Sequence, residues 1–334
     1  MPVAAQGRSG EAVFDRRAIP ANAREGTWSA PDGHSIRRLD WLYPNISSRG
    51  SLLFLPGRGD YYEKYLETLD HWARRGWRVT ALDWRGQGGS GRLGIDSATG
   101  HVKDFALWLA DLAAFWGTWR GVGNGPNIVV AHSMGGQLAL RAAAEDLIDP
   151  AALVLAAPML GLARRVPGAA MHQVSRAMAA WGDDRRPAWK WKQEPGDTLA
   201  WRMRMLTHDA ERYADEVWWR AHRPELAMGP GSWRWVERAY ASMRGLERAG
   251  VLERVTIPTI IIASSGDRLV SYSAIERAAR RITRAELVRF GDEAAHEILR
   301  ESDPVRDKAL RRIDDFLDRV LRDASSHTLS GSSG

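Results

Sequence analysis

The chain has 334 residues, 44% of them hydrophobic and 26% charged, which suits one large globular domain with an insertion or two ordinary domains. The formal charge is +6, yet basic and acidic residues are interspersed, so nucleic acid is not an expected partner; the absence of cysteine excludes disulfides, thiol catalysis and cysteine-ligated metals. The N-terminus lacks a signal-peptide core and no run is apolar enough to span a membrane, so we expect a cytoplasmic protein, with peripheral contact at the inner membrane left open.

Short apolar runs alternate with helical patterns along most of the chain. Residues 1–24 are predicted to form an irregular arm, and the following two runs flank a Pro-Asp-Gly turn that is typical of a β-hairpin. The later runs lie at 51–55, 77–84, 127–131, 152–157, 259–264 and 285–290. Continuous apolar strands separated by helices predict an α/β fold, with a mostly parallel central sheet and helices on both faces.

The alternation breaks between residues 161 and 250. This stretch has no clear buried strand and holds half of the sixteen tryptophans. We therefore predict a core formed by 25–160 and 251–322, a helical cap (lid) formed by 161–250, and a disordered tail at 323–334. Because open α/β sheets bind ligands beyond the carboxyl ends of their strands, the cap is expected to roof a ligand site.

A serine stands where the strand at 127–131 turns into a helix. A sharp turn of this kind exposes the serine hydroxyl at the top of the sheet, and it requires small residues two positions before and two positions after it. Ala131 and Gly135 meet that requirement around Ser133, and His132 completes the predicted nucleophile elbow. A serine that merely caps the helix is the alternative, but the strand–serine–helix context favours a nucleophile.

A serine hydroxyl needs a base, and the base needs an orienting acid. In this architecture they follow in the order serine, acid, histidine. Asp267 comes just after the strand at 259–264, and His296 lies in a loop after the last strand. We therefore predict a Ser133–Asp267–His296 triad.

Four other residues compete for the roles of acid and base. Asp292 and Glu293 are rival acids, but they lie in the same loop as His296 and close to it in sequence. Among rival bases, His101 precedes the nucleophile in the chain, and the side chain of His132 should diverge from its neighbour on an extended backbone. We therefore rank all four below the predicted triad.

A tetrahedral intermediate also needs two hydrogen-bond donors for its oxyanion. The residue after the nucleophile, Met134, offers one backbone N–H, and the Gly-rich loop at 56–59 offers a second at Arg58. An ordinary Gly-rich turn is the alternative for this loop. A different pattern, Gly86-x-Gly88-x-x-Gly91, resembles a dinucleotide-binding turn, but no helical sequence follows it. We therefore expect no cofactor.

Five motifs together resemble the α/β-hydrolase superfamily. They are "PGRGDYYEKY", "LDWRGQGGSGR", "AHSMGGQLAL", "SSGDRLV" and "AAHEILRE". The chain is most similar to the bacterial lysophospholipase L2 and monoacylglycerol lipase-like branch, sometimes grouped with serine aminopeptidases. This resemblance implies a cofactor-free serine hydrolase with a helical lid. By motif position it supports the predicted triad and the two oxyanion donors.

The expected reaction is hydrolysis of a small carboxylic ester or lysolipid through an acyl-enzyme. Two alternatives stay open. An aminopeptidase-type amide hydrolase needs an acidic group in the lid to hold the substrate amine, for which the candidates are Asp183, Asp184, Asp215 and Glu216. A non-catalytic binder on this fold is the other alternative, and the intact set of three triad residues argues against it.

Overall fold

The computed structural model describes residues 14–163, 168–190 and 197–330. Eight strands form one sheet in the order β1-β2-β4-β3-β5-β6-β7-β8. The strands are β1 (Ala23–Ser29), β2 (Ser35–Trp41), β3 (Gly50–Leu55), β4 (Trp77–Leu82), β5 (Asn127–His132), β6 (Ala152–Ala156), β7 (Thr259–Ser264) and β8 (Ala285–Phe290). The β1–β2 and β2–β4 pairs are antiparallel, and the remaining pairs are parallel. The predicted hairpin and mostly parallel sheet are both present.

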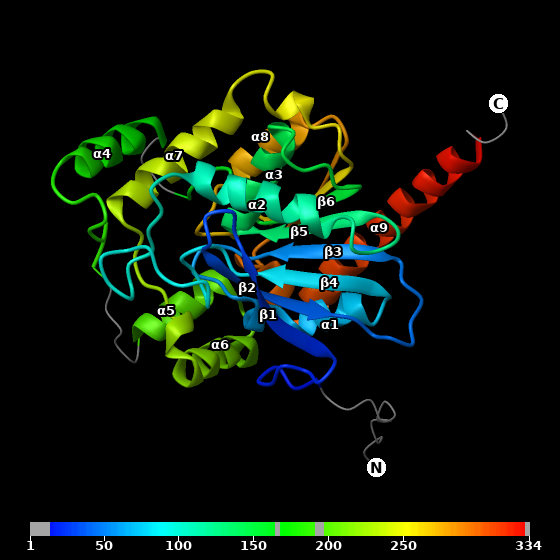
Figure 1. The fold of residues 1–334 in the computed structure, drawn as a ribbon. Helices are drawn as coiled ribbons and strands as arrows, with labels where there is room; N and C mark the ends of the chain where they lie inside the picture. The colour runs from blue at the N-terminus through cyan, green and yellow to red at the C-terminus, as the bar shows by residue number, and fades with distance from the viewer. Residues whose placement is uncertain (1–13, 164–167, 191–196, 331–334) are drawn as a thin grey trace, which may run out of the picture.

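Helices cover both faces of the sheet (Figure 1). One face carries α2 (Phe105–Trp119), α3 (Ser133–Ala144) and α8 (Tyr272–Arg281); the other carries α1 (Leu66–Ala73) and α9 (Asp303–Ser330). Successive residues of a strand point to opposite faces, so Leu53 and Leu55 of β3 join one apolar core while Leu52 and Phe54 join the other. Burial on both sides explains why the central strands have continuous apolar sequences.

The two ends of the chain differ from the sequence-based expectation. Helix α9 continues to Ser330, so residues 323–330 are helical and not a disordered tail. No glycine or proline interrupts them before Gly331, and the helix can therefore propagate. Residues 331–334 and 1–13 lie outside the described part. In the predicted arm, Phe14 stacks on Trp41 of β2 with ring centroids 6.2 Å apart.

In the described part of the chain between β6 and β7 there are four α-helices: α4 (Gly168–Ala180), α5 (Asp197–Leu206), α6 (Ala210–His222) and α7 (Trp233–Glu247). We call them the inserted helices. None of the described residues between 161 and 250 joins the eight-stranded sheet. Figure 1 shows α5 and α6 beyond the arrowheads of β3 and β4. The division into a core and a cap domain stays a prediction, but the inserted helices occupy the region where a roof was expected.

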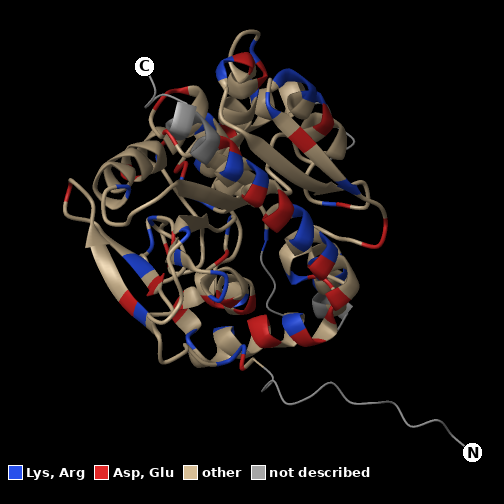
Figure 2. Cartoon of the chain, turned by 90° about the vertical axis from the view of Figure 1, so that its right-hand side faces the viewer, with Lys and Arg blue, Asp and Glu red and all other residues tan. Residues whose placement is uncertain are grey.

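The surface mixes both signs of charge. In Figure 2, acidic and basic positions lie side by side along the helices that face the viewer. Within the described ranges, no helix combines the length and apolar character that crossing a bilayer requires.

Candidate active site

Ser133 sits at the junction of β5 and α3 with a φ of 50°, a left-handed conformation that residues other than glycine rarely adopt. Two small neighbours make this turn possible. Ala131 is fully buried, and a Cβ on Gly135 would lie 2.4 Å from the carbonyl oxygen of Pro56. The strained turn holds the hydroxyl at the end of the strand, as the sequence context predicts.

Three side chains that are far apart in the sequence meet at this turn. His296 Nε2 lies 2.9 Å from Ser133 Oγ, and His296 Nδ1 lies 2.7 Å from Asp267 Oδ2. The other carboxylate oxygen of Asp267 accepts hydrogen bonds from the backbone N–H groups of Leu269 and Val270, at 2.7 and 3.0 Å. The acid is therefore fixed by its own loop, and it fixes the imidazole in turn.

The electrostatics of the pair favour a charged carboxylate and a basic imidazole. Burial by itself would raise the pKa of Asp267, but the charge and hydrogen bond of His296 outweigh burial and lower that pKa. Burial would lower the pKa of His296, yet the negative charge and hydrogen bond of Asp267 raise it, with smaller contributions from Glu297 and Asp60. The imidazole is consequently a stronger base than a free histidine.

The rival residues lie elsewhere. His101 Nδ1 is 2.9 Å from Ser232 Oγ at the start of α7, and Glu293 accepts a hydrogen bond from the backbone of its own loop. His132 points away from the neighbouring hydroxyl: its Nδ1 is 3.0 Å from Asp60 Oδ2 and 2.9 Å from Tyr65 Oη. The only described side chain that hydrogen-bonds to the serine hydroxyl is that of His296.

The loop at 56–59 packs directly against the elbow. A Cβ on Gly57 would lie 3.0 Å from Ser133 Cβ. Trp84 Nε1 donates to the Pro56 carbonyl at 2.8 Å, and Gly59 N donates to Gln87 Oε1 at 2.7 Å. The turn that resembled a dinucleotide-binding motif therefore supplies Gln87 as a support for this loop, and the next helix begins only at Phe105.

Two backbone N–H groups beside the serine are available as donors. Among the described residues, the N–H of Arg58 has no hydrogen-bond acceptor. The N–H of Met134 belongs to the first turn of α3, where helical N–H groups have no partner within the helix. Arg58 follows Gly57, which packs against Ser133, and Met134 follows Ser133 in the chain, so both predicted donors adjoin the elbow.

A buried ionic network that was not expected from the sequence lies next to the site. Lys64 forms ion pairs with Asp60, Glu216 and Glu297, and Arg300 also pairs with Glu216 and Glu297. Asp60 contacts His132 next to Ser133, and Glu297 follows His296 in the chain, so the network connects both sides of the site with Glu216 of α6. The four-residue spacing of Asp60 and Lys64 was the available sequence signal.

A cavity of about 440 Å³ opens above the serine. Its wall is formed by loops at the end of the sheet and by residues of α5 and α7. The apolar part of the lining consists of Met159, Leu162, Trp189, Trp201, Met205, Leu206, Trp235, Val236, Ala239, Leu269 and Val270. Ser133 and His296 lie at its base. The site is therefore a concave pocket whose lining is largely apolar but includes polar and charged groups, as small-molecule sites usually do.

Comparison with known proteins agrees with this geometry. The family model "Serine aminopeptidase, S33" matches residues 46–303. Lysophospholipase L2 of Escherichia coli K12 is 32% identical over 288 residues, covering 80% of each chain, and a probable lysophospholipase L2 of Haemophilus influenzae is 22% identical. A soluble variant of monoglyceride lipase from Saccharomyces cerevisiae superposes with a TM-score of 0.69 at 19% identity, covering 92% of this chain and 99% of that one.

The mostly parallel sheet, its helical layers and the strand–serine–helix elbow define the α/β-hydrolase fold, as the sequence predicted. Within that fold, the chain belongs to the serine aminopeptidase S33 family.

Proposed function

We propose that the chain is a carboxylic-ester hydrolase that works through an acyl-enzyme, with Ser133 as nucleophile. His296 takes the proton of the hydroxyl as the oxygen attacks the ester carbonyl, and it then returns that proton to the leaving alcohol. Asp267 holds the imidazole tautomer and stabilises the imidazolium. Water, deprotonated by the same histidine, releases the acid. The continuous hydrogen-bonded path from Asp267 through His296 to Ser133 carries this proposal.

The backbone N–H groups of Arg58 and Met134 are proposed to bind the oxyanion of both tetrahedral intermediates. The proposal is supported by the position of Arg58 next to Gly57, which packs against Ser133, by the position of Met134 next to Ser133, and by the absence of another acceptor for either N–H among the described residues. Ala131, His132 and Gly135 are proposed to shape the elbow. No cofactor takes part in this mechanism.

The substrate class is proposed to be an ester with one acyl chain, as in lysophospholipids and monoacylglycerols. The apolar lining of the cavity suits a hydrocarbon chain, and its polar base suits an ester. The names of the relatives, lysophospholipase L2 and monoglyceride lipase, agree with this class.

Peptide-bond hydrolysis from an amino terminus fits the described charges less well. Asp183 pairs with Arg185, and Asp184 pairs with Arg234. The other two candidates, Asp215 and Glu216, also pair with basic side chains. No carboxylate among these candidates is left to bind a substrate amine.

The test compares the wild type with Ser133→Ala and with Ser273→Ala, which removes an exposed hydroxyl on α8. We expect Ser133→Ala to lower kcat by roughly 10⁶-fold on short p-nitrophenyl esters and to abolish labelling by a fluorophosphonate, while the control resembles the wild type. A labelled Ser133→Ala protein would contradict the nucleophile. Faster turnover of aminoacyl-naphthylamides than of monoacyl esters would instead favour the amide hydrolase, and an unlabelled wild type would favour a binder.

A further inference from the structure

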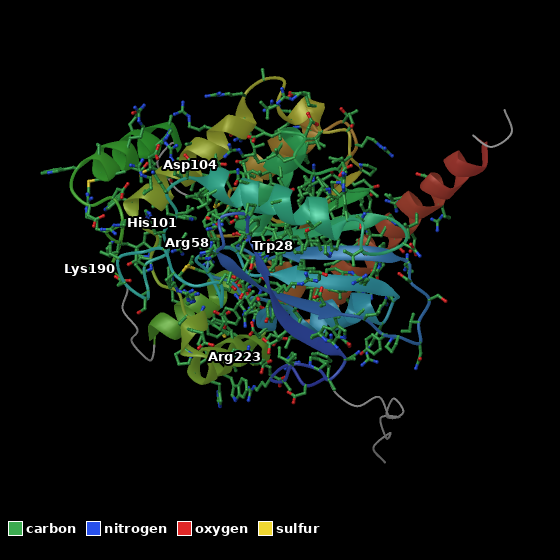
Figure 3. The ribbon with its side chains drawn as sticks, in the orientation of Figure 1. Trp28, Arg58, His101, Asp104, Lys190 and Arg223 are labelled. Atoms are coloured by element: carbon green, nitrogen blue, oxygen red, sulfur yellow. The ribbon has the colours of Figure 1, made fainter. Side chains whose placement is uncertain are left out.

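One cation in the cavity wall has no carboxylate partner among the described residues. Arg58 donates from Nη2 to the carbonyl oxygen of Gly229 at 2.8 Å. Its Nε is buried without an acceptor, and no described group accepts a hydrogen bond from its Nη1. Arg58 lines the cavity, and Figure 3 shows it on the side of the sheet where the inserted helices lie. A guanidinium in this state retains donors for a ligand.

Two indole rings hold the guanidinium in place. Its central carbon lies 5.3 Å from the ring centroid of Trp189 and 4.8 Å from that of Trp235. Aromatic faces attract a cation and orient it, but they leave its net charge uncompensated. Burial and the positive charge of Arg202 on α5 together lower the pKa of Arg58 to about 9. The guanidinium is thus fixed, and its charge is not neutralised by the described part of the chain.

The acidic residues that line the cavity have other partners. Asp60 binds Lys64, Tyr65 and His132, and Glu297 pairs with Lys64. These contacts direct both carboxylates into the buried ionic network and leave the cavity surface near Arg58 with an excess of positive charge.

Other wall residues add unused donors. The Nε of Arg202 and the Nε1 of Trp235 are buried and lack acceptors among the described residues. Arg202 has one distant ion pair, at 3.6 Å, with Glu216. Buried polar groups normally have hydrogen-bond partners, so a cluster of donors without acceptors points to an electron-rich ligand.

We propose that the side chain of Arg58 binds the phosphate of an anionic monoacyl ester. Arg58 would then contact the substrate at two points: its backbone N–H binds the oxyanion, and its guanidinium binds the phosphate of the head group. This inference rests on the proposed function. The path of bonds from an acyl carbonyl carbon to the phosphorus of a monoacyl glycerophosphate is about as long as that from an arginine Cα to its guanidinium carbon. A planar guanidinium also matches the paired oxygens of a phosphate.

The experiment uses two substrates that differ only in the phosphate, 1-octanoylglycerol 3-phosphate and 1-octanoylglycerol, both below their micellar concentrations. The readout is the ratio of their kcat/KM values within each variant, so a general loss of activity cancels. We expect Arg58→Gln to lower this ratio by roughly 10- to 100-fold in disfavour of the phosphate ester. Arg58→Lys should fall between it and the wild type, because a lysine keeps the charge but loses the paired donors. Arg311→Gln, an exposed arginine on α9, is the control and should keep the wild-type ratio.

A second arm needs no variant and separates a head group from free phosphate. Glycerol 3-phosphate should inhibit wild-type hydrolysis of p-nitrophenyl butyrate competitively and more strongly than inorganic phosphate or glycerol. Equal inhibition by glycerol 3-phosphate and inorganic phosphate would overturn the head-group assignment. An unchanged substrate ratio in Arg58→Gln would overturn the role of the side chain while leaving the ester hydrolase in place. If the wild type hydrolyses neither ester, the proposed function itself fails.

Discussion

The base and the roof of the cavity differ in whether their polar groups already have hydrogen-bond partners. At the base, the hydroxyl of Ser133, the imidazole of His296 and the carboxylate of Asp267 all have partners within hydrogen-bond distance. In the wall and roof, the Nε of Arg58, the Nε of Arg202 and the Nε1 of Trp235 lack acceptors among the described residues. The difference is instructive because a reacting group must be positioned before substrate arrives, whereas a recognition group must keep its hydrogen bonds free for the ligand.

The contrast extends to backbone strain and packing. The base contains a serine with positive φ, held by glycines that admit no side chain, and a buried ionic network packs behind it. The roof contains exposed aromatic residues such as Trp201, which is 56% exposed. Substitutions at the base should therefore affect kcat and folding stability, while substitutions in the roof should affect substrate choice.

The strongest test of a pre-organised base is Asp267→Asn. An asparagine keeps the shape of the side chain but removes the charge that stabilises the imidazolium and selects its tautomer, so we expect kcat to fall by about 10⁴-fold. Asp292→Asn, an exposed acid in the loop of His296, is the matched control and should change kcat by less than about threefold. Equal losses of kcat in the two variants would contradict the assignment of Asp267 as the acid of the triad.

Lys64→Met tests whether the network behind the base stabilises the fold. The substitution leaves Asp60, Glu216 and Glu297 without their shared cation, so the free energy of unfolding should fall by about 3–5 kcal/mol in urea denaturation. Arg120→Met removes an exposed partner of Asp149 and should cost at most about 1 kcal/mol. Comparable losses would show that burial does not set the strength of these pairs.

A pair of glycine substitutions tests the steric demand of the elbow. Gly135→Ala forces a Cβ against the Pro56 carbonyl and should lower the free energy of unfolding by about 1–3 kcal/mol, with a loss of kcat. In α2, a Cβ on Gly117 meets nothing, so Gly117→Ala should stabilise the protein by up to about 1 kcal/mol. The two thermal midpoints should move in opposite directions; a shift of the same sign in both would contradict the tight contact.

The smallest expected effect is on the pH profile. The base must be neutral to act, and Asp267, with Glu297 and Asp60, raises the pKa of His296. The acidic limb of kcat/KM should therefore lie above the ordinary histidine value of about 6.5, with activity rising as pH increases through it. In Asp267→Asn the residual activity should have its limb at lower pH, because the neighbouring charge is gone. If the acidic limb of Asp267→Asn lies at the same pH as that of the wild type, a group other than His296 controls it.

The sequence by itself determined the local features of this protein. The apolar runs predicted the strands because burial on both faces requires continuous hydrophobic residues, and the small residues around Ser133 predicted the elbow because its geometry excludes larger ones. Asp267 and His296 could be proposed from their positions after strands. The helical end of α9 was missed because polar composition says little about a segment without helix breakers.

Only the tertiary structure decided which distant groups meet. Lys64, Glu216 and Glu297 come from separate elements, and no local pattern relates them, since ion pairing depends on distance in space and not on separation along the chain. The same reason applies to the side chain of Arg58, because the sequence predicted a role only for the backbone N–H of this residue. The tertiary structure brings Trp189 and Trp235 close to its guanidinium and brings no described carboxylate to it.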